Sequence, residues 1–356
     1  MTTLSNKAPA VLVHGGRLNQ MAELYQIPIG QWLDLSTGIS PTSYPIPEIP
    51  QVIWQQLPQP SKSLLEAARR YYGTKNITAT SGSQAIIARL PYLFQNHVQS
   101  CKDNIDVWLP RVGYKEHEKS WCDAGFNIKQ YHQLPSCDEL TQHAIVVVIN
   151  PNNPTGQLQQ QQTLTTLLKK IAALSGWLVV DEAFMDVINP SQSMIHLTEN
   201  KHLFVLRSVG KFFGLAGIRI GFLSANPYWL NKLTQMSSPW EVNGPAQFIT
   251  EQALNNQKWQ SRQQQTLITL STQLEELLST TFLKPFNKGE GLKVSISGCG
   301  LFKTLIHPHA IDLFQSFCRQ GLYVRLCDEE NALRFGVPKQ EQFEKLTGLL
   351  TQHRHC

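Results

Sequence analysis

Short apolar runs alternate with helix-like stretches between residues 76 and 225 of the chain. The runs occupy residues 105–110, 144–150, 177–184, 202–208 and 218–223. Their apolar character is continuous rather than alternating, which is typical of strands buried on both faces of a mostly parallel sheet that helices cover. The pattern predicts a large α/β domain.

The pattern changes on both sides of this region. Residues 1–60 are rich in proline and glycine, which predicts an arm with little regular structure. Residues 63–72 have the apolar spacing of a helix that ends at Gly73. Helix-compatible stretches within 244–280 precede apparent strands, which we expect at 292–296, 301–306, 321–325 and 332–336, and a final helix at 339–352. Strands with few intervening helices predict a smaller α+β domain. The predicted organisation is an arm over 1–60, a large domain over 61–240 and a small domain over 241–356.

Composition excludes several classes of protein. The net charge of +5 is scattered along the 356 residues, which argues against a nucleic-acid surface. No run approaches the roughly 18 apolar residues of a membrane span.

The seven cysteines include no Cys-x-x-Cys pair, so neither a disulfide framework nor a zinc site is expected. Residues 1–13 lack the pattern of a secretory signal, so we expect a cytoplasmic protein whose partner is a small molecule. His353, His355 and Cys356 are interpreted as a frayed tail rather than a metal site.

Four motifs follow predicted strands, and ligands of open α/β sheets bind outside the carboxyl ends of strands. The motifs are NPNNPTG at 150–156, DEAF at 181–184, SVGK at 208–211 and Arg219, eight residues beyond the lysine. In this order and spacing they resemble the fold-type I pyridoxal-phosphate enzymes of the aminotransferase class I and II family. The resemblance covers most of the chain. It implies a large cofactor-binding domain with a mostly parallel sheet, a smaller C-terminal domain and a homodimer.

The resemblance also implies a residue for each part of pyridoxal 5'-phosphate. Lys211 would bind the aldehyde from a dry, positively charged pocket that keeps its amine nucleophilic. Asp181 would pair with the pyridine nitrogen and keep it protonated. The other implied cofactor-binding residues are Ser81, Gly82, Ser83, Gln84, Ser208 and Arg219 at the phosphate, Asn153 at the 3-oxygen and Tyr114 against the ring. Without the resemblance, Asp181 could be a helix cap, residues 151–156 a turn and Tyr114 a packed aromatic.

Three further stretches resemble the threonine-phosphate decarboxylase subgroup of that family. They are VHGGRLNQMAELYQIP followed by LDLSTGISP, PRVGYKEHEKSW, and VLRSVGKFFGLAGIRIGF with DEAF upstream. The subgroup implies decarboxylation of L-threonine O-3-phosphate to (R)-1-amino-2-propanol O-2-phosphate in cobalamin biosynthesis. Arg334, Asn153 and Gly38 would bind the substrate carboxylate, since a forked guanidinium suits that group. His14, Gly15 and Gly16 would bind the substrate phosphate.

The chain also departs from its relatives at a few positions. Arg17 stands where many relatives have asparagine, which leaves the phosphate contacts open, and His14 could be a satisfied surface histidine. Leu57 replaces a tyrosine that precedes proline in many fold-type I enzymes. Phe184 lacks the hydroxyl that aminotransferases use near the 3-oxygen. The last two changes fit the decarboxylase subgroup.

The nearest alternative is an aminotransferase of the histidinol-phosphate type, which shares the GLAG-Arg stretch and a phosphorylated substrate. Phe184 and the His-Gly-Gly arm argue against it. A non-catalytic regulator on the same fold would need an added DNA-binding domain, for which the fold leaves no room. A nicotinamide dehydrogenase is excluded because no G-x-G-x-x-G follows the first strand.

Overall fold

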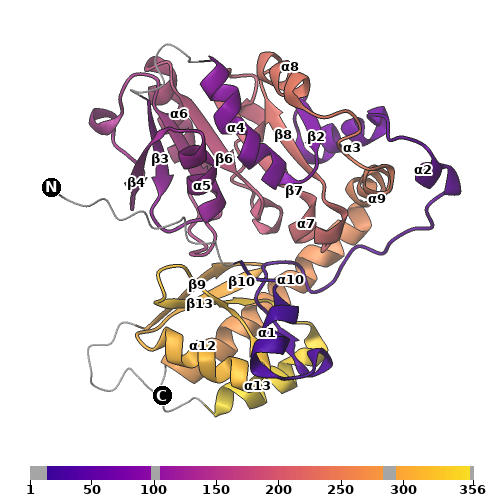
Figure 1. Ribbon diagram of the computed structural model, residues 1–356, viewed down its shortest axis with the longest axis vertical. Coiled ribbons are helices and arrows are strands. Elements are labelled where there is room, and N and C mark those ends of the chain that lie inside the picture. Colours follow the sequence, from indigo (N-terminus) through magenta and orange to yellow (C-terminus); the bar gives the residue numbers. More distant parts are fainter. Residues whose placement is uncertain (1–13, 98–104, 284–293, 353–356) are drawn as a thin grey trace.

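The large domain is built on a seven-stranded sheet, seen in the upper half of Figure 1. The computed structural model describes residues 14–97, 105–283 and 294–352. The strand order is β2–β8–β7–β6–β5–β3–β4, and every neighbouring pair is parallel except the two that β8 makes. The strands are β2 (Ile77–Thr80), β3 (Asp106–Pro110), β4 (Asn127–Tyr131), β5 (Ile145–Ile149), β6 (Trp177–Asp181), β7 (Leu203–Ser208) and β8 (Gly221–Ala225). The predicted mostly parallel sheet is confirmed.

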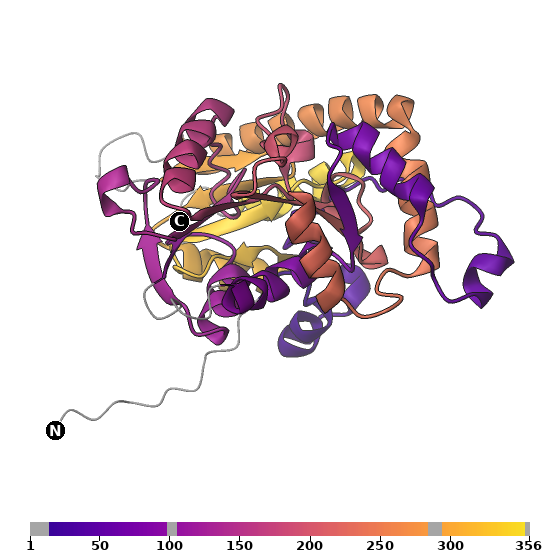
Figure 2. The same ribbon diagram turned by 90° about the horizontal axis from the view of Figure 1, so that it is seen from above.

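Helices cover both faces of this sheet, as Figure 2 shows from above. In β5, Ile145 and Val147 face one hydrophobic core, whereas Val146 and Val148 face the other. This two-sided burial is the reason for the continuous apolar runs in the sequence. One core includes α4 (Ser83–His97), α5 (Lys115–Asp123) and α8 (Pro227–Met236). The other includes α3 (Lys62–Tyr72), α6 (Gln161–Ala173) and α9 (Gly244–Asn255).

The predicted helix at 63–72 illustrates how local signals set the element bounds. The Ser61 hydroxyl caps the start of α3 by accepting a hydrogen bond from the backbone N–H of Leu64. Gly73 ends the helix in the left-handed conformation, at a φ of 70°, which glycine adopts without a Cβ clash. Leu64, Ala67 and Ala68 are buried against the sheet.

The small domain contains a four-stranded antiparallel sheet in the order β12–β13–β10–β9. Its strands are β9 (Ser295–Cys299), β10 (Phe302–Ile306), β12 (Arg325–Leu326) and β13 (Ala332–Gly336). Its core also contains residues of α10 (Gln257–Leu278), α12 (Ala310–Arg319) and α13 (Phe343–Thr351). The predicted smaller α+β domain is therefore confirmed.

The amino-terminal arm is more regular than predicted. Helix α1 (Leu18–Tyr25) packs beside α12, and β1 (Leu33–Asp34) pairs in parallel with β11 (Leu322–Tyr323). Leu18, Met21, Ala22 and Tyr25 contact a small core around Trp32. Their spacing is that of one helix face, so the helix was readable from the sequence despite the nearby glycines. The segment thus belongs spatially to the small domain.

Two hydrophobic cores cross the predicted domain boundaries. Leu33 and Leu35 from the arm join the small-domain core, whereas α9 packs on α3 within the large domain. The boundaries at residues 60 and 240 stay a prediction. Residues 1–13 and the tail residues His353, His355 and Cys356 lie outside the described residues. Among the helices of the described residues, none has the length and apolar character to cross a membrane.

Candidate active site

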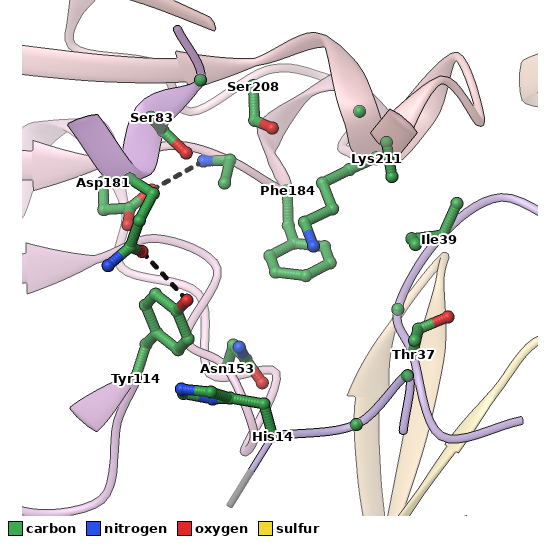
Figure 3. A pocket seen from close by; sticks show the side chains of 18 of the residues that line it. His14, Thr37, Ile39, Ser83, Tyr114, Asn153, Asp181, Phe184, Ser208 and Lys211 are labelled. Carbon is green, nitrogen blue, oxygen red and sulfur yellow. Dashed lines mark hydrogen bonds between the residues drawn. The ribbon is translucent and has the colours of Figure 1, made fainter. Parts of the chain in front are cut away.

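A cavity of about 330 Å³ lies at the carboxyl ends of the large-domain strands, against the small domain. Its large-domain wall comprises residues 82–84, Tyr114, Asn153, Asp181, Ser208, Lys211 and Arg219. Its small-domain wall comprises residues 14–16, residues 37–39, Arg325 and Arg334. Figure 3 shows the two walls facing each other, with the Lys211 side chain extending between them. Every site residue predicted from the sequence lines this cavity except Ser81.

Lys211 lies in the short helix α7 (Val209–Phe212), directly after β7. Burial and the nearby charge of Arg334 lower the pKa of its amine to about 8. The amine lies 5.3 Å from the centre of the Phe184 ring. An amine with a lowered pKa is more often neutral near pH 7 and is therefore a better nucleophile.

Asp181 is held rigidly at the end of β6. One carboxylate oxygen accepts a hydrogen bond from the backbone N–H of Ala183, at 3.0 Å. The other lies 2.9 Å from Nε2 of His117, which is buried in α5. His117 was not predicted; its position in the first turn of α5, three residues after the N-cap residue Tyr114, was the available signal. The carboxylate keeps one orientation toward the cavity.

The turn after Asp181 is fixed by a buried ion pair on the opposite side of the strand. Glu182 pairs with Arg207 of β7 at 2.8 Å and accepts a hydrogen bond from the backbone N–H of Met194. Arg207 also pairs with Asp186, and all three charged side chains are buried, so loss of Arg207 would leave two buried carboxylates without their partner. The pair thereby stabilises the strand ends that carry Asp181 and Ser208.

One end of the cavity lies at the amino terminus of α4. Ser83 begins the helix there, where the helix dipole favours negative charge, whereas the backbone N–H of Gly82 donates to the carbonyl of Thr80 at 2.7 Å. Gly82 has a φ of 85°, a conformation that favours glycine, and a Cβ atom there would lie 3.2 Å from the Arg219 guanidinium. Arg219 adopts the left-handed conformation, at a φ of 54°.

Ser81 does not join this end of the cavity. Its hydroxyl and its backbone N–H both donate to Glu241, at 3.0 and 3.3 Å. Glu241 in turn pairs with Arg89 at 2.7 Å. The predicted role of Ser81 at the cofactor phosphate is therefore not supported by its placement, because its donors are directed to a residue 160 positions away.

Tyr114 begins a hydrogen-bonded chain along the large-domain wall. Its hydroxyl donates to the Gln84 side chain at 3.0 Å, as drawn in Figure 3. Gln84 donates to Glu116, and Glu116 accepts from His14 at 2.6 Å. Burial and the charge of Glu116 raise the pKa of Tyr114 to about 12, so its hydroxyl stays protonated near neutral pH.

Two arginines lie side by side on the small-domain wall. Arg334 donates to the side chain of Asn153 and to the backbone oxygen of Ser36. Arg325, which was not predicted, is its cross-strand neighbour and makes long contacts, of 3.4 Å or more, with Asp328. Burial and Arg325 lower the pKa of Arg334 to about 10. Two buried like charges facing one cavity favour a ligand that carries more than one negative group.

Two glycines allow close approaches at the cavity. A Cβ atom on Gly38 would lie 2.9 Å from the Phe184 ring of the other wall, and one on Gly15 would lie 2.2 Å from the backbone oxygen of Ser36 within the small-domain wall. The backbone N–H of Gly16 donates to the Ser36 hydroxyl at 2.8 Å. Among the residues that the structure describes, no group of His, Cys, Asp or Glu side chains is arranged to hold a metal ion.

The profile of the aminotransferase class I and II family matches residues 54–349. This chain belongs to that family. Solved structures agree in fold: histidinol-phosphate aminotransferase from Sinorhizobium meliloti, in complex with pyridoxal-5'-phosphate, has a TM-score of 0.75 at 15% identity, over 99% of this chain and 98% of that one. L-threonine-O-3-phosphate decarboxylase from Porphyromonas gingivalis has a TM-score of 0.66 at 16% identity, over 96% and 97%. The fold is the pyridoxal-phosphate-dependent fold of the family.

Within the family, two curated relatives are similar to nearly the whole chain. Threonine-phosphate decarboxylase from Pseudomonas aeruginosa is 36% identical over 93% of this chain and 94% of that protein. The Sinorhizobium enzyme of the same name is 34% identical over 90% and 91%. Histidinol-phosphate aminotransferase from Aliivibrio fischeri is 30% identical over 58% of this chain and 57% of that protein.

Proposed function

We propose that this family member catalyses the pyridoxal-phosphate-dependent decarboxylation of L-threonine O-3-phosphate, with release of CO₂ and (R)-1-amino-2-propanol O-2-phosphate. The observation that carries the proposal is the similarity to two threonine-phosphate decarboxylases along at least nine-tenths of the chain. The sequence similarity to the histidinol-phosphate aminotransferase of Aliivibrio fischeri covers 58% of the chain, and the structural likeness to such enzymes, at 15% identity, shows the shared fold alone. The place in cobalamin biosynthesis and the cytoplasmic location stay predictions.

The cavity residues fit pyridoxal 5'-phosphate. Lys211 would hold the aldehyde, Asp181 the pyridine nitrogen and Asn153 the 3-oxygen. The glycine at position 82 leaves room for the phosphate beside Arg219, with Ser83, Gln84 and Ser208 completing that end and Tyr114 lying along the ring. When bound, the cofactor withdraws the electron pair left on Cα of an amino acid, which is chemistry that protein side chains cannot supply.

The small-domain wall supports a substrate with two anionic groups. Arg334 would bind the α-carboxylate through its fork, with backbone at Gly38 nearby. Arg325, His14 and the backbone N–H of Gly15 would bind the phosphate, whereas the backbone N–H of Gly16, which the sequence also assigned to it, donates to the Ser36 hydroxyl. Two anchors on one wall would prevent rotation about the bond between the amino nitrogen and Cα. They would therefore decide which of the other bonds to Cα is oriented for cleavage. We infer that they align the bond to the carboxylate.

Lys211 would complete the reaction as a proton donor. The bond between Cα and the carboxylate breaks, CO₂ leaves, and Cα then requires one proton. An amine with a pKa of about 8 can hold that proton near neutral pH and release it in the transition state. Its position between the two walls suits this role (Figure 3).

We also propose a homodimer. The segment around α2 (Gln51–Gln55) projects from the body of the molecule in both views (Figures 1 and 2). It exposes large apolar side chains that a partner subunit would cover. They are Ile46, Val52, Trp54 and Leu57. Light scattering of the active protein should give twice the chain mass; full activity in a stable monomer would contradict the proposal.

The activity is tested by giving pure protein, reconstituted with the cofactor, O-phospho-L-threonine and measuring CO₂. A parallel reaction contains histidinol phosphate and 2-oxoglutarate, with glutamate as the product measured. We expect CO₂ in stoichiometric amounts with the amino phosphate product and no glutamate. Glutamate formation without CO₂ would replace the proposal by the aminotransferase alternative.

A further inference from the structure

Glu116 connects the two walls of the cavity. It lies in the first turn of α5, on the large-domain side, and its side chain is mostly buried. One carboxylate oxygen accepts from Nε2 of His14 at 2.6 Å, and the other accepts from Gln84 at 3.0 Å. The ion pair with His14 spans 102 positions of the sequence.

His14 is attached to the small-domain wall through its own backbone. The next two residues, Gly15 and Gly16, pack against Ser36, whose hydroxyl accepts from the Gly16 N–H. The backbone oxygen of Ser36 also accepts from Arg334 at 2.7 Å. Ser36 therefore links the proposed carboxylate anchor to the segment that carries His14.

The contact with Glu116 decides how the imidazole is presented. A carboxylate only accepts hydrogen bonds, so Nε2 carries the proton in this contact. The other ring nitrogen, Nδ1, is then the atom that can face a ligand, and it donates to a phosphate oxygen when the ring is the imidazolium, in which both nitrogens carry a proton. The His14 ring lies beside Tyr114, with the ring centres 5.8 Å apart, at the edge of the cavity (Figure 3). Its backbone and one ring nitrogen are both held, so its rotamer is set from two sides.

We infer that Glu116 is a positioning residue for substrate selection: it holds His14, and with it the residue 14–16 segment, at the mouth of the cavity where the substrate phosphate binds. This inference rests on the proposed function. In it, Glu116 sets the preference of the enzyme for a phosphorylated substrate. Glu116 acts through His14 rather than by contacting the substrate.

The variants Glu116→Ala, His14→Ala and the double variant test this role in the cofactor-loaded enzyme. Each single change should lower kcat/KM for O-phospho-L-threonine by about tenfold to a hundredfold, the usual range for one charge-assisted hydrogen bond. The double variant should lose no more than His14→Ala alone, because both changes remove one interaction. Glu116→Gln retains one acceptor for His14 and should lose less than Glu116→Ala.

The matched control is Glu118→Ala, two positions along the same helix. Glu118 pairs with Lys115 and Gln130 on the outer side of the domain, so kcat/KM should stay unchanged. Absorbance of the bound cofactor reports whether each variant is folded and loaded. The inference would be overturned if the losses of kcat/KM in the two single variants added up in the double variant. It would also be overturned if the variants lost the same factor of kcat/KM for threonine as for O-phospho-L-threonine.

The dissociation constant of O-phospho-L-threonine, from the absorbance change of the bound cofactor, separates this inference from the proposed function. If the wild type binds the ligand without releasing CO₂, the proposed function fails, and non-additive weakening by the variants still supports the role of Glu116. If the wild type releases CO₂ and Glu116→Ala binds normally, the role of Glu116 is wrong and the proposed function stands. A wild type that does neither overturns both.

Discussion

The two walls of the cavity are built in different ways. The large-domain wall collects residues that each lie within a few positions of a strand end, such as Asp181 on β6 and Ser208 on β7. The small-domain wall joins segments from opposite ends of the chain, since residues 14–16 and Arg334 meet through Ser36. The difference suggests a division of labour in which the first wall holds the cofactor and the second selects the substrate.

The largest effect is expected on the large-domain wall, at Lys211. Lys211→Ala removes the group proposed to hold the cofactor covalently and to return the proton to Cα. Loss of a proton-transfer group costs about 10²–10⁴-fold in rate, and the visible absorbance of the lysine-bound cofactor should disappear. Absorbance spectra before and after borohydride treatment check this. A band that survives borohydride and dialysis in the variant would assign the bond to another lysine.

A smaller effect is expected where the walls touch, at Gly38. In Gly38→Ala the added methyl group would meet the buried Phe184 ring at 2.9 Å and push the small-domain wall outward. Overpacking costs about 1–3 kcal/mol, so kcat/KM for the amino-acid substrate should fall about fivefold to a hundredfold.

Cofactor affinity is the control for Gly38→Ala, and titration with pyridoxal phosphate measures it. The affinity for the cofactor should hardly change. In the double variant Gly38→Ala/Phe184→Leu, the smaller side chain at position 184 should restore part of the activity. Equal loss of cofactor and substrate binding would mean that the two walls are not separate in function.

The mildest effect concerns pH and the amine of Lys211. Its pKa is lowered from about 10.5 to about 8, so the neutral, nucleophilic form predominates above pH 8. Capture of pyridoxal phosphate by cofactor-free protein should therefore accelerate about tenfold per pH unit below 8 and level off above it. Stopped-flow absorbance measures this rate. A rise that continues to pH 10 would show that the pocket does not lower the pKa.

The same contrast explains what the sequence could and could not predict. Lys211, Asp181 and Arg219 sit in contiguous motifs beside buried strands, so local pattern and family resemblance were enough to place them in the cavity. Arg325 lies on a two-residue strand, and its place in the cavity follows from the pairing of that strand with the one that carries Arg334, which the sequence does not indicate. The contact between His14 and Glu116 likewise depends on the docking of distant segments.

Two further differences have physical causes of the same kind. Ser81 occurs in a motif typical of phosphate binding, yet a distant carboxylate, Glu241, takes both of its donors. The arm contains α1 because its apolar face could be buried on α12, which outweighed the surrounding prolines and glycines. Sequence propensities and motifs describe each segment by itself. The contacts that the segment finally makes are determined by its packing against distant parts of the chain.

The division between the walls is tested most directly by Arg325→Ala, with CO₂ release measured from O-phospho-L-threonine and from threonine. Arg325 is buried in the small-domain wall and is proposed to hold only the phosphate. Arg319 of α12 is exposed, and Arg319→Ala serves as the control. Its kcat/KM for both substrates should equal that of the wild type.

The account predicts that Arg325→Ala lowers kcat/KM for the phosphorylated substrate by about tenfold to a hundredfold. Cofactor affinity and the slow reaction of threonine should be unchanged, so the preference for the phosphate falls by the same factor. An unchanged preference, or a loss of cofactor binding in parallel with activity, would contradict it.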